Sequence, residues 1–134
     1  MTILAASILP IRAQQSTTLE GSAQDTTLTG KNLIDACRLI ANGTTPPADK
    51  SFQAGICLGE LEALNWGAPG AYDENLRSCV PDGVTRQQLA NVAVDYLDGN
   101  RDRLREPFEG LALESFAHSW PCPKTQGMFG KRLD

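Results

Sequence analysis

The residue types best suited to chemistry in this chain are its four cysteines, Cys37, Cys57, Cys79 and Cys122, and its one histidine, His118. No two cysteines form a C-x-x-C pair, the spacing found in many structural zinc sites and in thioredoxin-type redox centres. The sequence therefore predicts no metal site, and it predicts no cofactor. In an exported protein an even number of cysteines favours two disulfides.

A Cys–His nucleophile pair is the alternative, because His118 precedes Cys122 by four residues. Such a pair needs a free thiolate and a well-placed imidazole, and Pro121 breaks the helix between the two residues. The carboxylates are scattered, and nothing selects two of them as a general acid and base. We therefore predict no catalytic residue and a protein that is not an enzyme, with His118 exposed near a helix end.

Helices must position these cysteines, because four segments have amphipathic helical periodicity and none alternates like a strand. The segments cover about residues 30–42, 51–66, 86–100 and 101–119. The predicted fold class is all-α, a small bundle of about four helices arranged as two antiparallel hairpins, each braced by a disulfide. Pro107 interrupts the last segment, so that helix either kinks there or begins there.

Local signals indicate where the helices begin. Thr29 is expected to cap the first helix, and Ser51 or Asp49 the second. The third opens with a T-x-x-Q capping box formed by Thr85 and Gln88.

The second helix carries an apolar stripe that we expect to face the core. Its members are Phe52, Ile56, Gly59 and Ala63. Gly55 and Gly59 are four residues apart, which would let a neighbouring backbone approach closely. The alternative is that these glycines only weaken the helix.

Four cysteines allow three disulfide pairings, and hairpin geometry narrows the choice among them. The turn of the first hairpin centres near residue 47, which places Cys37 and Cys57 at the same height. The turn of the second centres near residue 100, which places Cys79 and Cys122 at its open end. Both pairs then suit the Cα separation of about 4.4–6.8 Å that a disulfide needs. We predict Cys37–Cys57 and Cys79–Cys122, each contributing roughly 2–4 kcal/mol.

The stretch best suited to bind a partner is the long loop at 65–78, NWGAPGAYDENLRS. Loops of this length in compact domains are often functional, and Trp, Tyr and Arg are enriched at interface hot spots. The predicted partner-binding residues are Trp66, Tyr72, Asp73, Glu74 and Arg77. The alternative is that the two aromatic rings fold over the core as a lid.

Composition excludes some classes of function. The chain has 134 residues, a net charge of −4 and a pI near 4.9, which argues against nucleic-acid binding because that needs clustered Lys and Arg. It has no run of 18 apolar residues, so no membrane span is predicted.

The two ends of the chain differ from the helical domain predicted over residues 30–122. Residues 1–13, MTILAASILPIRA, are similar to the end of a secretory signal peptide with cleavage after Ala13. The alternative is the frayed apolar N-terminus of a cytosolic protein. Residues 14–29 are predicted to be a disordered linker, and 123–134 a flexible tail.

The motifs of the domain, taken together, resemble the Tai and resistance-associated immunity protein family over residues 30–122. The motifs are Cys57 with Gly59, the C-x-P-x-G-V-T-x-x-Q-L run from Cys79, the Tyr96–Leu97 pair and the closing WPC. The resemblance implies a small helical fold, a secretory signal, disulfides and a homodimer. It also implies a periplasmic protein that occludes a type VI secretion amidase effector. Arg101 departs from the family pattern, where proline is common.

Two functions are therefore considered. As an inhibitor, a disulfide-braced bundle would fill the groove of the amidase with little ordering cost, and its acidic surface would favour a basic partner. The alternative is a general periplasmic stress protein without a cognate effector. Such a protein would act as an acid-responsive chaperone, exposing apolar faces when its carboxylates protonate.

Overall fold

The computed structural model describes residues 28–124, and within this range the chain forms helices and no strand. The α-helices are α1 (Gly30–Ala41), α2 (Ser51–Gly67), α3 (Arg86–Gly99) and α4 (Phe108–Ser119). Three short 3-10 helices connect them, η1 (Ala68–Gly70), η2 (Glu74–Leu76) and η3 (Arg101–Arg103). The predicted all-α class is confirmed. The signal-peptide prediction at 1–13 lies outside the described residues, as do most of the predicted linker and tail.

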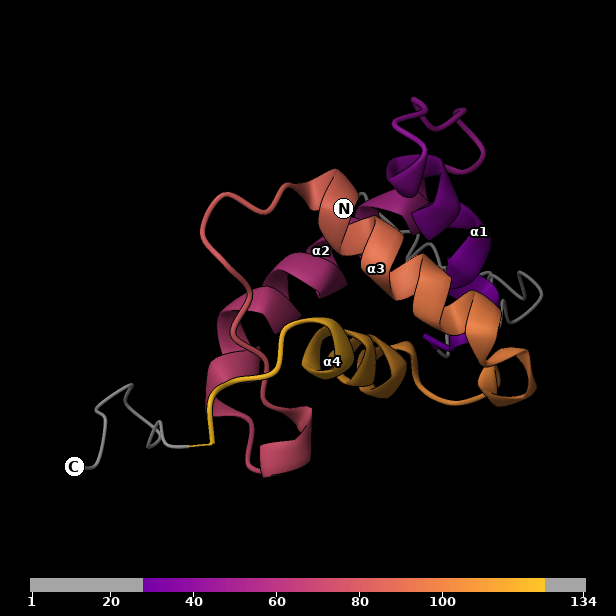
Figure 1. Ribbon diagram of the computed structural model, residues 1–134. Coiled ribbons are helices and arrows are strands. Elements are labelled where there is room, and N and C mark those ends of the chain that lie inside the picture. Colours follow the sequence, from indigo (N-terminus) through magenta and orange to yellow (C-terminus); the bar gives the residue numbers. More distant parts are fainter. Residues whose placement is uncertain (1–27, 125–134) are drawn as a thin grey trace, which may run out of the picture.

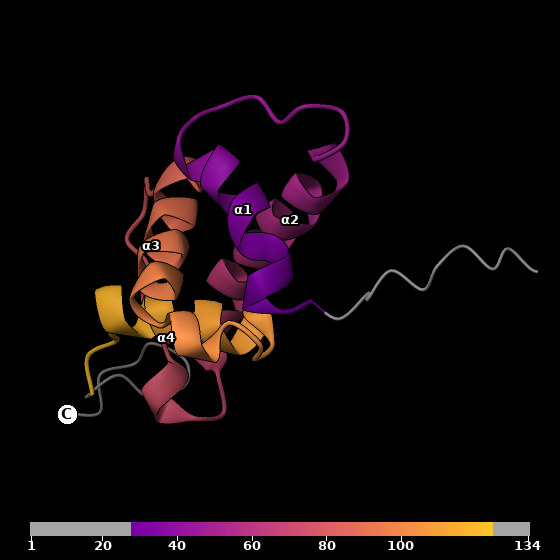
Figure 2. The same cartoon turned by 90° about the vertical axis from the view of Figure 1, so that its right-hand side faces the viewer.

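Helix α1 packs against both α2 and α3 and lies between them in the view of Figure 2. Helix α4 packs on α3 and runs across the ends of the other helices (Figures 1 and 2). The core between them contains apolar side chains from all four helices. Its largest fully buried members are Leu33, Leu61, Leu97, Leu111, Phe108 and Phe116.

Two of the three predicted helix starts are confirmed. The Thr29 hydroxyl accepts a hydrogen bond from the Asn32 N–H, and Thr85 with Gln88 forms the complete capping box. The prediction for α2 was wrong, because Lys50 occupies the cap position and makes no side-chain capping bond. Ser51 is already helical, and its hydroxyl donates to the Pro47 carbonyl oxygen at 2.9 Å.

Helix α4 begins directly after Pro107 and does not kink there. Pro107 has extended backbone and pairs with Thr29 in an isolated bridge, while the Phe108 N–H donates to the Leu28 carbonyl at 2.7 Å. The missing N–H of proline is no loss at a helix start, since the first N–H groups have no helical partner. Leu28 and Thr29, assigned to the linker from sequence, are therefore bonded to the domain.

Each hairpin contains the disulfide that the geometry predicts. Cys37 and Cys57 join α1 to α2 with a Cα separation of 5.6 Å, and both residues are completely buried. Cys79 and Cys122 join the chain before α3 to the chain after α4, with a Cα separation of 4.8 Å. Beside this second bond, the Cys79 N–H donates to the Trp120 carbonyl at 2.8 Å.

Helix α2 buries the face opposite to the one expected. Phe52, at the start of the expected stripe, is 76% exposed, whereas Leu61 is 0% exposed. The disulfide explains the rotation, because Cys57 must point at α1 and its neighbours at helical spacing turn inward with it. The inward residues are Ala54, Cys57, Leu61 and Leu64. A Cβ atom on Gly55 or Gly59 would meet no atom within 4 Å, so neither glycine serves close packing inside this chain.

Candidate partner-binding surface

The connection between α2 and α3 is fixed at both ends. Ala68 and Ser78 are buried, 1% and 0% exposed. Ser78 pairs with Pro121 in an isolated bridge, and the next residue, Cys79, is held by its disulfide to Cys122. The segment between these anchors, residues 69–77, is thus presented on a rigid base.

Side chains within this segment fix its shape. The Arg77 Nε donates to the Ala71 carbonyl at 2.8 Å, and the Asp73 carboxylate accepts from the Asn75 N–H at 2.9 Å. Glu74 lies 3.5 Å from the Arg77 guanidinium and remains exposed. Tyr72 stands between these contacts with its whole surface exposed. The segment therefore offers a freely accessible aromatic ring on an ordered turn.

The alternative in which the aromatic rings cover the core is wrong, because Trp66 is 88% and Tyr72 100% exposed. The core beneath is instead closed by Leu64 and Ala68, which are buried.

Four of the five residues predicted to bind a partner lie together. Tyr72, Asp73, Glu74 and Arg77 are on the one loop, whereas Trp66 is in the last turn of α2, on the far side of η1. The side chain of Arg77 is only 19% exposed, so this residue positions the loop and is not suited to direct contact. The other three, Tyr72, Asp73 and Glu74, are exposed.

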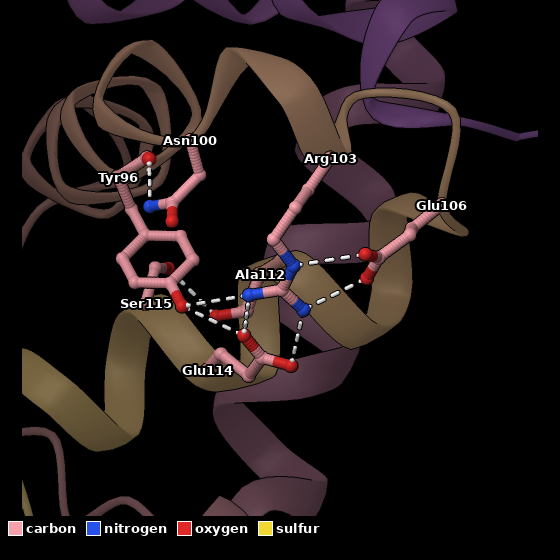
Figure 3. A network of polar contacts seen from close by, with 7 residues as sticks. All are labelled: Tyr96, Asn100, Arg103, Glu106, Ala112, Glu114 and Ser115. Atoms are coloured by element: carbon pink, nitrogen blue, oxygen red, sulfur yellow. Dashed lines mark hydrogen bonds and ion pairs between the residues drawn. The ribbon is translucent and has the colours of Figure 1, made fainter.

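A polar network that the sequence reasoning missed connects α3, η3 and α4 (Figure 3). The Arg103 guanidinium donates two hydrogen bonds to Glu114, at 2.7 and 2.9 Å, and two to Glu106, both at 2.8 Å. The Tyr96 hydroxyl donates to Glu114 at 2.6 Å. The three-residue spacing of Arg103 and Glu106 could have indicated their ion pair. The bond from Arg103 to Glu114 could not be found in this way, because it depends on the position of α4 in the fold.

The other helices are also linked by ion pairs. Arg38 of α1 forms a two-pronged pair with Asp98 of α3, at 2.8 and 2.9 Å, and Arg101 adds a contact to the same carboxylate. Arg86 of α3 pairs with Glu62 of α2. These contacts join α1 to α3 and α2 to α3.

The paired carboxylates are expected to make the fold acid-sensitive. Hydrogen bonds from Arg103 lower the pKa of Glu114 and Glu106 below 4.5, and Arg38 lowers that of Asp98 below 3.8. A carboxyl with a lowered folded-state pKa stabilises the fold above its unfolded pKa and loses that contribution as the pH falls. The midpoint of urea unfolding should therefore be constant near neutral pH and fall between about pH 5 and pH 3.

The variant Glu114→Gln tests the cause of this acid sensitivity. It should be less stable than the wild type at pH 7, and its urea midpoint should change less between pH 5 and pH 3. Glu109→Gln is the control, since Glu109 is on the same helix, exposed, and outside the network. An unchanged pH profile in Glu114→Gln would show that other carboxyls govern acid unfolding.

A shallow concavity of about 380 Å³ lies between α3 and α4. It is lined by Val92, Asp95, Tyr96, Gly99, Asn100, His118 and Ser119. His118 is exposed in the last turn of α4, as predicted, with its ring 6.4 Å from that of Tyr96. Because Cys122 is bonded to Cys79, the Cys–His nucleophile hypothesis is wrong.

Among residues 28–124, no three His, Cys, Asp or Glu side chains are grouped closely enough to hold a metal ion. In the same range, none of the helices combines the length and apolar character needed to cross a membrane. The described residues present an exposed aromatic ring, Tyr72, beside the exposed acidic side chains of Asp73 and Glu74.

The family model of the Rap1a immunity proteins matches residues 29–122. The chain belongs to the Rap1a immunity protein family. The match begins at Thr29, the cap of α1, and ends at Cys122, so it coincides with the domain that the two disulfides close. No curated protein and no solved structure is matched. Membership of the Rap1a family indicates an immunity function, in agreement with the immunity-protein resemblance over 30–122.

Proposed function

We propose that this Rap1a-family protein is a periplasmic immunity protein that binds a type VI-secreted peptidoglycan amidase and inhibits it by steric occlusion. The observation that carries the proposal is the family match over residues 29–122. Two disulfides support export, because such bonds persist in oxidising compartments and are rare in the cytosol. The protein acts as a homodimer and blocks the substrate groove of the amidase, with no chemistry of its own.

The contact with the amidase is made by the loop between α2 and α3. Tyr72 is its anchor, because an exposed ring can enter an apolar groove and lose most of its water contact. The loop is already fixed by Arg77 and the Cys79–Cys122 bond, so little conformational entropy is lost on binding. Asp73 and Glu74 beside the ring favour a basic rim on the amidase.

The test is protection followed by affinity. A secreted amidase encoded beside this chain is expressed in the bacterial periplasm alone or with the chain, and lysis is recorded. Protection is expected together with binding at micromolar affinity or better in calorimetry. If the amidase lyses cells equally in both cases and no binding is detected, the proposal is refuted.

Replacing Tyr72 with alanine should weaken amidase binding by about 30-fold or more, since a hot-spot aromatic contributes roughly 2 kcal/mol or more. The unfolding temperature should not change, because the ring makes no buried contact. Tyr72→Phe keeps the ring and is expected to retain most of the affinity. Equal affinity for wild type and Tyr72→Ala would exclude this loop as the contact.

The alternative is an acid-responsive periplasmic chaperone-like protein, and the lowered pKa values of Glu106 and Glu114 beside Arg103 favour it. That function requires the chain to suppress aggregation of an unrelated client below about pH 4 while its near-UV circular dichroism is lost. Suppression without any amidase binding would favour the alternative over the immunity proposal.

A further inference from the structure

The outer face of α2 is an apolar stripe that is mostly exposed; of its members, only Ile56 is partly buried against the core. Its members follow one another at intervals of three or four residues and so share one side of the helix. They are Phe52, Ile56, Gly59, Ala63 and Trp66. Phe52 is 76% and Trp66 88% exposed. Figure 2 shows α2 at the edge of the bundle, with α1 on its inner side.

The stripe contains no charged residue, although charges border it. Glu60 and Glu62 lie on either side, and Glu62 is already paired with Arg86 of α3. An uncharged apolar centre with a charged border is the composition of a protein interface.

Gly55 and Gly59 of α2 are not required for close packing within the described chain. Each costs roughly 1 kcal/mol relative to alanine inside a helix, and a Cβ on Gly55 or Gly59 would meet no atom within 4 Å. Together with Ala63 they form a row of small residues at intervals of four, between the two exposed rings. Such a row permits close approach by a second backbone, which would explain why glycine is present.

The stripe is also self-complementary about Gly59. Phe52 and Trp66 are each seven residues from Gly59, and Gly55 and Ala63 are each four residues from it. Two copies of α2 packed antiparallel across a two-fold axis at Gly59 therefore place Phe52 of each copy against Trp66 of the other, and Gly55 against Ala63. A two-fold interface requires this kind of match between a surface and itself.

Charge favours the same antiparallel arrangement. Lys50 stands at the N-terminal end of α2, and the C-terminal end leads through η1 to Asp73 and Glu74. Antiparallel packing places the lysine of one copy near the C-terminal end of α2 of the other, where the helix dipole is negative, and it also opposes the two helix dipoles favourably.

The area available fits a modest dimer. Helix α2 has 17 residues, which gives a length of about 25 Å. Its two aromatic rings can bury roughly 150–250 Å² each, or about half of the ~800 Å² per partner in a standard interface. Ile56, Ala63 and the bordering side chains add to this, so association in the micromolar range is expected.

We propose that two copies of this chain associate through the outer face of α2, antiparallel, with the two-fold axis at Gly59. The inference rests on the homodimer in the proposed function and gives it a surface, but it is independent of amidase inhibition. It assigns Trp66 to the dimer and leaves the Tyr72 loop free for the amidase.

The first test is sedimentation velocity of the oxidised full chain from about 1 to 100 μM. The wild type should shift from monomer to dimer, and Gly59→Arg should weaken the dimer at least 100-fold. Because a Cβ at position 59 would meet no atom within 4 Å and the residue is exposed, the variant should fold with an unchanged or higher unfolding temperature at 1 μM. Gly110→Arg is the matched control, since it replaces a glycine of α4 whose surroundings are equally open, and it should retain the dimer.

Cross-linking tests the register. Gly59→Cys should form a disulfide-linked dimer with itself, because position 59 lies on the axis. Gly55→Cys should not do so alone, but it should cross-link to Ala63→Cys when the two variants are mixed. Cross-linking of Gly55→Cys to itself at the efficiency of Gly59→Cys would overturn the proposed register.

Three results overturn the dimer surface. They are a wild type that stays monomeric at 100 μM, a dimer that Gly59→Arg leaves intact, and a monomer whose α2 stripe is covered by the amidase in their complex. Failure of the amidase proposal can be told apart from failure of the dimer. In that case the chain would not protect cells from the amidase, although the Gly59→Cys cross-link would still form.

Discussion

Replacing Cys37 and Cys57 together by alanine is expected to lower the unfolding free energy by about 4–5 kcal/mol. The bond closes a separation of 20 residues, for which the loss of chain entropy in the unfolded state gives roughly 3 kcal/mol. Both sulfurs are fully buried, so their removal leaves space in the core and adds roughly 1 kcal/mol or more. A domain of this size has about 5–15 kcal/mol in total, so the variant should be partly unfolded at 37 °C.

The second disulfide provides the comparison. Cys79–Cys122 closes 43 residues, and chain entropy alone would make it the more stabilising bond by less than about 1 kcal/mol. Its cysteines are only half-buried, so little packing is lost with them. In thermal unfolding followed by circular dichroism, the Cys37→Ala/Cys57→Ala variant should therefore have a lower unfolding temperature than the Cys79→Ala/Cys122→Ala variant. The reverse order would mean that loop length outweighs burial in this fold.

Leu61→Ala is expected to lower the unfolding free energy by about 2–5 kcal/mol, because Leu61 is fully buried where α2 meets the core. Phe52→Ala on the same helix should change it by no more than about 0.5 kcal/mol, since the ring is mostly in water. Both are measured by urea unfolding near 1 μM, where self-association is negligible. A larger loss in Phe52→Ala than in Leu61→Ala would show that α2 is turned the other way.

The features that were predictable from sequence depend on neighbours along the chain or on simple counting. The capping box needs only Thr85 and Gln88, and the start of α4 needs only Pro107. The disulfide pairing followed from equal distances to two turns, which holds in any pair of antiparallel helices.

The orientation of α2 was not predictable from periodicity, because this helix has apolar residues on two faces. Phe52, Ile56 and Ala63 make one face, and Cys57, Leu61 and Leu64 make the other. The bond from Cys57 to Cys37 determines which of the two faces is buried. Hydrophobicity alone does not distinguish them.

The candidate site was predictable in composition but not in detail. The long loop with its exposed aromatic and acidic residues could be found by inspection. That Arg77 turns inward to bond Ala71 depends on the three-dimensional course of the loop. The pairing of Arg103 with Glu114 likewise depends on tertiary folding, since eleven residues separate them.

Both disulfides join cysteines that are consecutive in the chain, the first to the second and the third to the fourth. A chain that is oxidised while it crosses a membrane from its N-terminus would present Cys37 and Cys57 first, with no other thiol available to compete. Cys79 would then wait for Cys122, its one remaining partner. Oxidation in the order of emergence therefore yields the native bonds directly, and maturation of this protein should not require a disulfide isomerase.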